Sequence, residues 1–216
     1  MYNRYFVSGI GTDVGKTVAS AILCKALNAA YWKPVQSGTV VGSDKHTIRE
    51  LCGASQIIYP ECFALREPLS PHTAARIDGV SISVDSIELP EHQGPLIIEG
   101  AGGLMVPITR DFLYYEWIIQ QRIPVILVSR HYLGSLNHTL LSLDFLKNQN
   151  METLGVLFIG KDNDYNESLI CERYSVRNLG NIPEVNTVNA TFIQSYADEL
   201  NNFWTLMNFM NLLQQS

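Results

Sequence analysis

The sequence predicts an α/β fold, a three-layer sandwich in which helices flank a mostly parallel sheet. Short apolar runs rich in β-branched residues alternate with helical stretches along the chain, which is the rhythm of β-α-β units. The apolar runs alternate little with polar residues, as is typical of strands buried on both faces. The chain has 216 residues, of which 46% are hydrophobic, so we expect a single domain with a full core over residues 1–216.

The sequence predicts strands at residues 4–8, 31–35, 95–99, 124–129 and 153–159. It predicts helices at residues 15–28, 43–52, 113–121, 135–148 and 191–213. Residues 53–94 hold four of the nine prolines and several turn signals, and no element is predicted there. Residues 203–213 are apolar and uncharged, which favours packing on the core or at a dimer seam.

Charge and targeting signals point to a small-molecule partner. The formal net charge is −6 and no run is rich in Lys or Arg, which argues against nucleic acid or an anionic membrane surface. The N-terminal apolar stretch is too short for a signal peptide, and no run approaches the ~18 apolar residues of a membrane span. We therefore expect a soluble, cytoplasmic protein.

Cysteine and histidine show no metal-binding pattern. The four cysteines contain no CxxC pair, and the five histidines form no H-x-x-x-H pair. We therefore expect free thiols, and Cys24, which follows three apolar residues, is predicted to be a packing residue.

Residues 8–17 read SGIGTDVGKT and lie between a predicted strand and a predicted helix. Gly15, Lys16 and Thr17 match the end of a phosphate-binding loop, but the pattern expects a glycine at position 10, which is Ile. Free N–H groups and the helix dipole favour an anion at such a helix start. Lys16 would neutralise the β- and γ-phosphates and the Thr17 hydroxyl would reach Mg²⁺, although an ordinary strand-to-helix turn also uses Gly and Thr.

Two carboxylates are candidates for further Mg²⁺ ligands. Glu99 ends an apolar strand and precedes a glycine-rich turn, at the edge of the sheet where ligands gather, although a charge there could merely mark the surface. Asp44 opens a predicted helix, where plain capping is an equally good interpretation. Lys33 lies within YWKPVQSG, where its charge needs either an anionic partner or a stem that leads it to water.

Together these residues resemble the dethiobiotin synthetase family, in the same order and over most of the chain. The matching blocks are the loop at 9–17, Lys33-Pro34-Val35-x-Ser37-Gly38, Asp44, Ser70-Pro71-His72, Glu99-Gly100-Ala101-Gly102-Gly103 and Leu133-Gly134-Ser135-Leu136-Asn137-His138. The family's loop resembles GTDTxVGKT, with one more residue between its glycines, which makes Gly9 the first loop glycine. The resemblance implies a P-loop NTPase-like fold and a homodimeric, ATP- and Mg²⁺-dependent enzyme of biotin synthesis. Such an enzyme joins CO₂ to 7,8-diaminononanoate and closes the ureido ring through a carbamic-phosphoric anhydride.

The resemblance also implies residue roles. Lys16 would stabilise charge on the transferred phosphoryl group, and Lys33 would hold the carbamate. The Mg²⁺ ligands would be Thr17, Asp44 and Glu99. The nucleotide and its phosphates would be bound by Thr12, Asp13, Val14, Gly15, Lys16, Thr17, Val18, Pro183 and Glu184. The diamine would be bound by Thr12, Ser37 and Gly102, and its distant carboxylate by Gly134, Ser135, Leu136 and Asn137 at a helix start from the partner subunit, although Asn137 could simply cap that helix.

Four positions depart from the family's pattern. Ile10 and Gly11 replace its Thr-Asp, and Asp13 replaces its usual Glu, which is one methylene longer. Ile159 stands where the family has an Asn that reads adenine, and an alkyl side chain cannot make that hydrogen-bond pair. We therefore expect weaker discrimination between ATP and GTP than is usual for the family.

Two other classes share the phosphate-binding loop. A partitioning or septum-site ATPase, a nucleotide switch, resembles KGGxGKT and would carry a lysine at the position of Gly11. A cobyric or cobyrinic acid synthase would need a glutaminase region, for which 216 residues leave no room. The sequence therefore favours the ligase, with the nucleotide switch as the alternative.

Overall fold

The structure is a computed structural model that describes residues 3–161 and 163–213, without the side chains of residues 202–213. The strands are β1 (Arg4–Gly9), β2 (Ala30–Trp32), β3 (Val35–Gln36), β4 (Phe63–Ala64), β5 (Leu96–Gly103), β6 (Val125–Arg130), β7 (Thr153–Ile159) and β8 (Asn178–Ile182). The helices are α1 (Lys16–Leu27), α2 (Asp44–Cys52), α3 (Pro71–Asp78), the 3₁₀ helix η1 (Val84–Ser86), α4 (Tyr114–Gln121), α5 (Ser135–Asn148), α6 (Asp164–Tyr174) and α7 (Ala190–Leu213).

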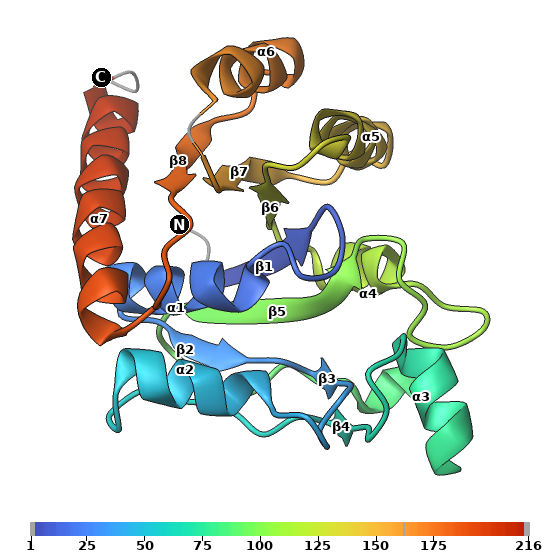
Figure 1. Cartoon of the computed structure of the whole chain (residues 1–216). Coiled ribbons are helices and arrows are strands. Elements are labelled where there is room, and N and C mark those ends of the chain that lie inside the picture. Colours follow the sequence, from blue (N-terminus) through green and yellow to red (C-terminus); the bar gives the residue numbers. More distant parts are fainter. Residues whose placement is uncertain (1–2, 162, 214–216) are drawn as a thin grey trace.

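Six strands form one parallel sheet in the order β2-β5-β1-β6-β7-β8 (Figure 1). β1 lies in the middle, with β5 on one side and β6 on the other, so three segments far apart in sequence end beside one another. The short strands β3 and β4 pair separately, beyond β2. The parallel sheet confirms the predicted fold class.

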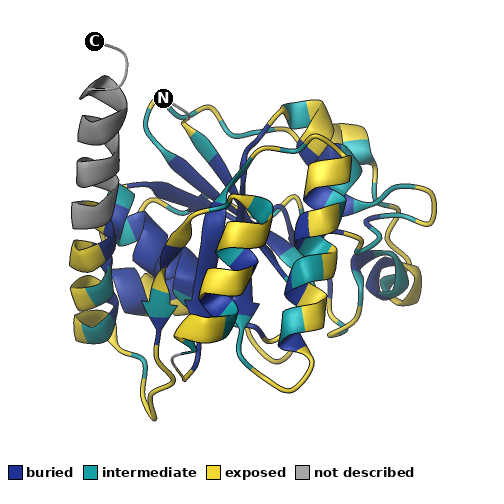
Figure 2. Ribbon diagram, turned by 90° about the horizontal axis from the view of Figure 1, so that it is seen from above, coloured by how far each residue is buried: buried dark blue, intermediate teal, exposed yellow. Residues whose placement is uncertain are grey.

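Helices cover both faces of this sheet. Tyr5 and Val7 pack in one apolar cluster with residues of α1, α2 and α7, whereas Phe6 packs in a second cluster with residues of α3, α4, α5 and α6. Successive side chains of a strand point to opposite faces, so both faces of β1 are buried. Figure 2 shows the buried strands between helices whose outer faces are exposed. The chain is thus a three-layer sandwich with two cores.

Most predicted elements are confirmed to within a few residues, and one strand is corrected. The prediction of a single strand at 31–35 is wrong, because the chain leaves the main sheet after Trp32 and pairs with β4 from Val35 onward. Pro34 has no N–H to offer a sheet, which explains the break. The prediction for the packing of residues 203–213 lies outside the described side chains.

The burial of two cysteines is consistent with the sequence analysis. Cys24 and Cys52 are buried, and burial raises the pKa of the Cys24 thiol well above its usual range, as fits a packing residue. Within the described residues, none of the helices combines the length and apolar character that a membrane span requires.

Candidate active site

The phosphate-binding loop connects β1 to α1, and two of its glycines have no room for a side chain. A Cβ on Gly9 would lie 2.5 Å from Val14 and 2.8 Å from the Gly11 carbonyl oxygen. Gly15 precedes α1 with a φ of +89°, and a Cβ there would lie 2.4 Å from Ile159 Cδ1. Gly9 therefore behaves as a loop glycine, although it stands one position earlier than the common pattern places it.

Lys16, the first residue of α1, reaches back across this loop. Its Nζ donates a hydrogen bond of 2.9 Å to the carbonyl oxygen of Gly11, and the residue is 7% exposed. Burial lowers the pKa of Lys16, an effect that the nearby Glu99 carboxylate opposes. The ammonium therefore lies over the loop between β1 and α1. A bound phosphate there would contact both the ammonium and the free N–H groups at the start of α1.

Four side chains from four segments converge beside Lys16. Thr17 Oγ1 lies 3.1 Å from Asp44 Oδ1 and 3.1 Å from Glu99 Oε1. Lys33 Nζ lies 3.1 Å from Glu99 Oε1 and also pairs with Asp44 Oδ2. Glu99 is 1% exposed and Lys33 is 7% exposed, so both charges are shielded from water. Each is balanced by the opposite charge of the other.

Electrostatics fix the charge of Lys33. Burial by itself would lower the pKa of Lys33, but the carboxylates of Glu99 and Asp44 outweigh it and raise that pKa above its usual range. Both carboxylates thus favour the charged form of Lys33, and because the residue is 7% exposed, its stem does not lead the charge to water.

The donor set suits Mg²⁺. Two carboxylates and a hydroxyl offer hard oxygen atoms on one side, and Mg²⁺ commonly takes one or two protein carboxylates together with phosphate oxygens and water. Among the described residues no three His, Cys, Asp or Glu side chains gather as a metal site. A cation here would therefore depend on nucleotide oxygens to complete its shell.

These groups line a cleft of about 860 Å³. Of the residues predicted to bind nucleotide, substrate or metal, the cleft brings together Thr12, Asp13, Gly15, Lys16, Thr17, Val18, Lys33, Ser37, Asp44, Glu99 and Gly102. Ser37 Oγ is buried there without a hydrogen-bond partner, as expected of a group that hydrogen-bonds to a bound ligand. The cleft extends past Ser70 and Pro71 at the start of α3, far beyond the phosphate loop.

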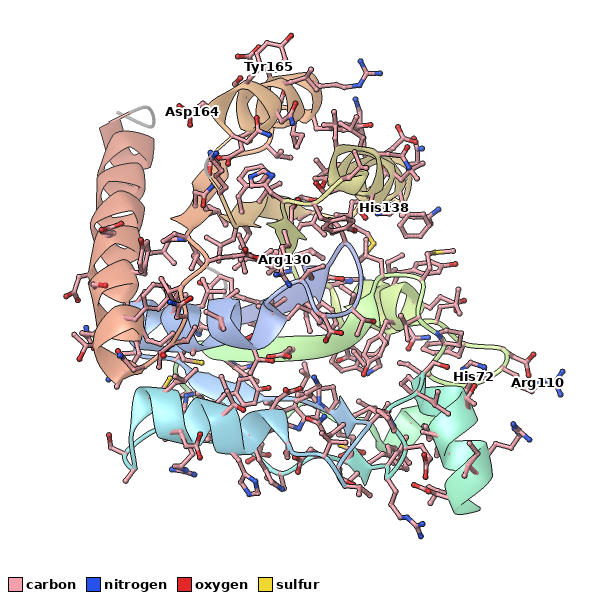
Figure 3. All side chains as sticks on the ribbon, viewed as in Figure 1. His72, Arg110, Arg130, His138, Asp164 and Tyr165 are labelled. Atoms are coloured by element: carbon pink, nitrogen blue, oxygen red, sulfur yellow. The ribbon has the colours of Figure 1, made fainter. Side chains whose placement is uncertain are left out.

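Other predicted site residues do not line this cleft. The side chain of Val14 packs in the core. Pro183 and Glu184 follow β8, and Glu184 forms an ion pair with Arg130, which Figure 3 labels. Arg130 Nη1 also donates a 3.1 Å hydrogen bond to the Asp13 carbonyl oxygen. The remaining four residues lie at the start of α5 and do not line the cleft of their own chain: Gly134, Ser135, Leu136 and Asn137.

Sequence reasoning missed three residues that support the site. Tyr31 donates a 3.1 Å hydrogen bond to Glu99 Oε2, and Gln36 Oε1 accepts one of 3.1 Å from the Asp44 backbone N–H. Arg130 links the loop to Glu184 as described above. For Gln36 and Arg130 the one signal available was a polar group at the end of an apolar strand, whereas Tyr31 gave no signal in the sequence.

Solved structures of low sequence identity share the fold. A ParA family ATPase from Chlorobium tepidum superposes with a TM-score of 0.58 at 12% identity, covering 90% of this chain and 97% of that one. The cell division ATPase MinD from Pyrococcus furiosus gives a TM-score of 0.53 at 14% identity, with 94% and 100% covered. At such identities the likeness concerns the P-loop fold alone.

Relatives at higher identity define the family. A family model described as an AAA domain matches residues 3–191. The ATP-dependent dethiobiotin synthetase BioD of Christiangramia forsetii is 42% identical over 200 residues, which cover 92% of this chain and 96% of that protein. The protein of the same name from Brucella ovis is 46% identical over 184 residues, with 85% and 87% covered. The chain therefore belongs to the ATP-dependent dethiobiotin synthetases within this AAA-domain family.

Proposed function

We propose that this chain uses ATP and Mg²⁺ to convert 7,8-diaminononanoate and CO₂ to dethiobiotin. The observation that carries the proposal is the convergence of Lys16, Lys33, Thr17, Asp44 and Glu99 on one cleft. Such a site unites a phosphate cradle, oxygen ligands for Mg²⁺ and a second buried cation outside the loop. The long cleft beside it leaves room for a second substrate.

The chemistry requires activation of a poor electrophile. One amine of the substrate takes up CO₂ and loses a proton, which gives a carbamate whose oxygen is a hopeless leaving group. Transfer of the γ-phosphoryl group of ATP to that oxygen releases ADP and gives a carbamic-phosphoric anhydride. The neighbouring amine then attacks the carbonyl carbon, loses its proton and expels phosphate, which closes the ureido ring.

The residues of the cleft serve positioning and charge neutralisation, which dominate phosphoryl transfer. Lys16 lies where it can neutralise charge on the transferred group, and Lys33 can hold the carbamate oxygen toward it. Thr17, Asp44 and Glu99 would hold Mg²⁺, which supplies charge neutralisation at the phosphates when bound. Thr12, Ser37 and Gly102 line the wall along which the diamine would lie.

A homodimer completes this proposal. Gly134 and Asn137 are exposed at the start of α5, outside the cleft of their own chain, so a partner could present them to the substrate carboxylate. Pro183 and Glu184 would lie on the base side of the nucleotide. We place the enzyme in the cytoplasm, where ATP is available.

A nucleotide switch is the alternative, and no observation favours it. The fold is shared with ParA and MinD proteins, but Gly11 is half-buried at the position of their lysine, and its backbone carbonyl accepts the Lys16 ammonium. A glycine there offers no charge to a partner subunit's nucleotide.

The first test is product formation. We expect ADP release from MgATP to depend on 7,8-diaminononanoate and bicarbonate, and mass spectrometry to detect dethiobiotin. Lys33→Ala should lower kcat by at least about 100-fold, because it removes a preorganised cation from the transition state. Lys147→Ala, which removes an exposed lysine near the end of α5, is the matched control and should leave kcat unchanged.

Two results would contradict the proposal. ATP hydrolysis that is indifferent to the diamine, with no dethiobiotin formed, would return the chain to the switch ATPases. Full activity of Lys33→Ala would place the chemistry elsewhere in the cleft.

A further inference from the structure

We propose that Tyr31 is a positioning residue for the magnesium site: its hydroxyl engages Glu99 Oε2 and thereby presents Oε1 to the cation. The inference rests on the proposed function in one respect only, that Glu99 binds Mg²⁺. It concerns a residue of β2 that lies outside the phosphate loop and does not line the cleft.

Strand register places Tyr31 against Glu99. Tyr31 pairs with Ile97 across the parallel β2–β5 ladder, and Glu99 stands two residues farther along β5. Residues two apart on a strand share a face, so the aromatic side chain reaches Glu99 diagonally. The hydroxyl lies 3.1 Å from Glu99 Oε2, and Tyr31 is fully buried.

The two oxygens of Glu99 are thereby divided between two environments. Oε2 accepts from Tyr31 at the sheet, whereas Oε1 lies 3.1 Å from both Thr17 Oγ1 and Lys33 Nζ. A carboxylate that is 1% exposed finds no water to replace a lost donor. Tyr31 thus fixes the rotation of the carboxyl group, as partners of metal ligands commonly do.

Divalent-cation binding to the full chain tests this role without relying on turnover. We would titrate Mn²⁺ by electron paramagnetic resonance in the presence of the non-hydrolysable analogue adenosine 5′-(β,γ-imido)triphosphate. Tyr31→Phe should raise the apparent Mn²⁺ dissociation constant about 10-fold, the lower end of the effect of such partners. The affinity for the analogue without any divalent cation should not change.

Tyr59→Phe is the matched control. Like Tyr31→Phe, this variant removes one phenolic hydroxyl group. The Tyr59 hydroxyl donates to the Glu91 carbonyl oxygen, away from the cleft. Its Mn²⁺ titration should match that of the wild type. An unchanged Mn²⁺ dissociation constant in Tyr31→Phe, or an equal loss of cation-free analogue binding, would overturn the inference.

A second measurement keeps the hydroxyl and so avoids the risk that Tyr31→Phe fails to fold. With 3-fluorotyrosine incorporated at position 31 alone, the ¹⁹F resonance should move when Mg²⁺ is added to the analogue complex. A resonance that ignores Mg²⁺ would overturn the role of Tyr31. If the Mn²⁺ and ¹⁹F results hold and no dethiobiotin forms, the proposed reaction fails and the positioning role stands.

Discussion

Ile159, at the end of β7, occupies the position at which the family resemblance expects an adenine-reading asparagine. The residue is 7% exposed, and its Cδ1 lies where a Cβ on Gly15 would collide, directly beneath the phosphate loop. An alkyl side chain in this place contributes packing under the loop and cannot donate or accept a hydrogen bond. Selectivity that depends on an amide at this position is therefore absent.

We expect kcat/KM for ATP and for GTP to differ by less than about 10-fold, because hydrophobic contacts discriminate polar isosteres poorly. Initial rates of dethiobiotin formation with each nucleotide, at fixed Mg²⁺ and diamine, give this ratio directly. A preference for ATP of 100-fold or more would mean that another group reads the adenine.

Residue chemistry was predictable where one residue conflicted with its local surroundings. Lys33 lies among apolar residues and Glu99 ends an apolar run, and both positions indicated a buried ionic role. An unpaired charge in an apolar environment would be costly. Tyr31 gave no such conflict, since tyrosine suits a strand well. Its role depends on the register of β2 against β5, which no local pattern contains.

The junction of β1 and α1 depends on a glycine that is strained for any other residue. Gly15→Ala would place a Cβ at a φ of +89° and within 2.4 Å of Ile159 Cδ1. The left-handed backbone costs about 1–3 kcal/mol and the overpacked contact a similar amount. We expect a loss of about 2–6 kcal/mol in the free energy of unfolding, measured by urea denaturation, and loss of ATP binding measured by calorimetry.

Gly79→Ala separates the two causes. Gly79 ends α3 with a φ of +68°, and a Cβ there meets no atom within 4 Å. This variant should lose only the backbone component, about 1–3 kcal/mol, and keep its ATP affinity. Equal losses in the two variants would show that the contact with Ile159 carries no weight.

Five elements were missed, namely β4, α3 and η1 within residues 53–94, where no element was predicted, and α6 and β8. For α6 and β8 the reason is an interrupted apolar pattern. α6 turns the buried carboxylate of Glu167 toward the sheet, and β8 reads NLGNI. Glu167 accepts hydrogen bonds from Asn178 and Asn181 and lies 2.7 Å from His131 Nε2. A network between distant segments thus replaces the apolar stripe that a sequence window could detect.

At the scale of the whole molecule, sheet order assembles the site. β1 lies between β5 and β6, and parallel strands present their carboxyl ends at one edge of the sheet. Thr17 and Glu99 meet there although 82 residues separate them. The sequence predicted that the loop and Glu99 would share this edge, whereas the order of the strands is contained in no local sequence pattern.

The same edge leaves an apolar side chain without cover. Leu133 is fully exposed in the turn between β6 and α5, directly before Gly134, and the adjacent Tyr132 is 42% exposed. An exposed leucine beside residues that would serve a partner's substrate is consistent with an interface. If the proposed dimer uses this turn, an acidic residue at position 133 would bury an unpaired charge between the subunits.

We therefore expect the wild-type chain to elute with twice its 24.2 kDa mass in size-exclusion chromatography with light scattering, and Leu133→Asp to shift toward the monomer. Leu133→Asp should lower kcat/KM for the diamine far more than it raises the KM for ATP, because the phosphate loop lies within one chain whereas the carboxylate site would span two. Ile57→Asp, at an exposed apolar position near β2, is the matched control and should remain dimeric. A wild-type monomer that makes dethiobiotin would contradict the shared site and require the substrate carboxylate to be bound within a single chain.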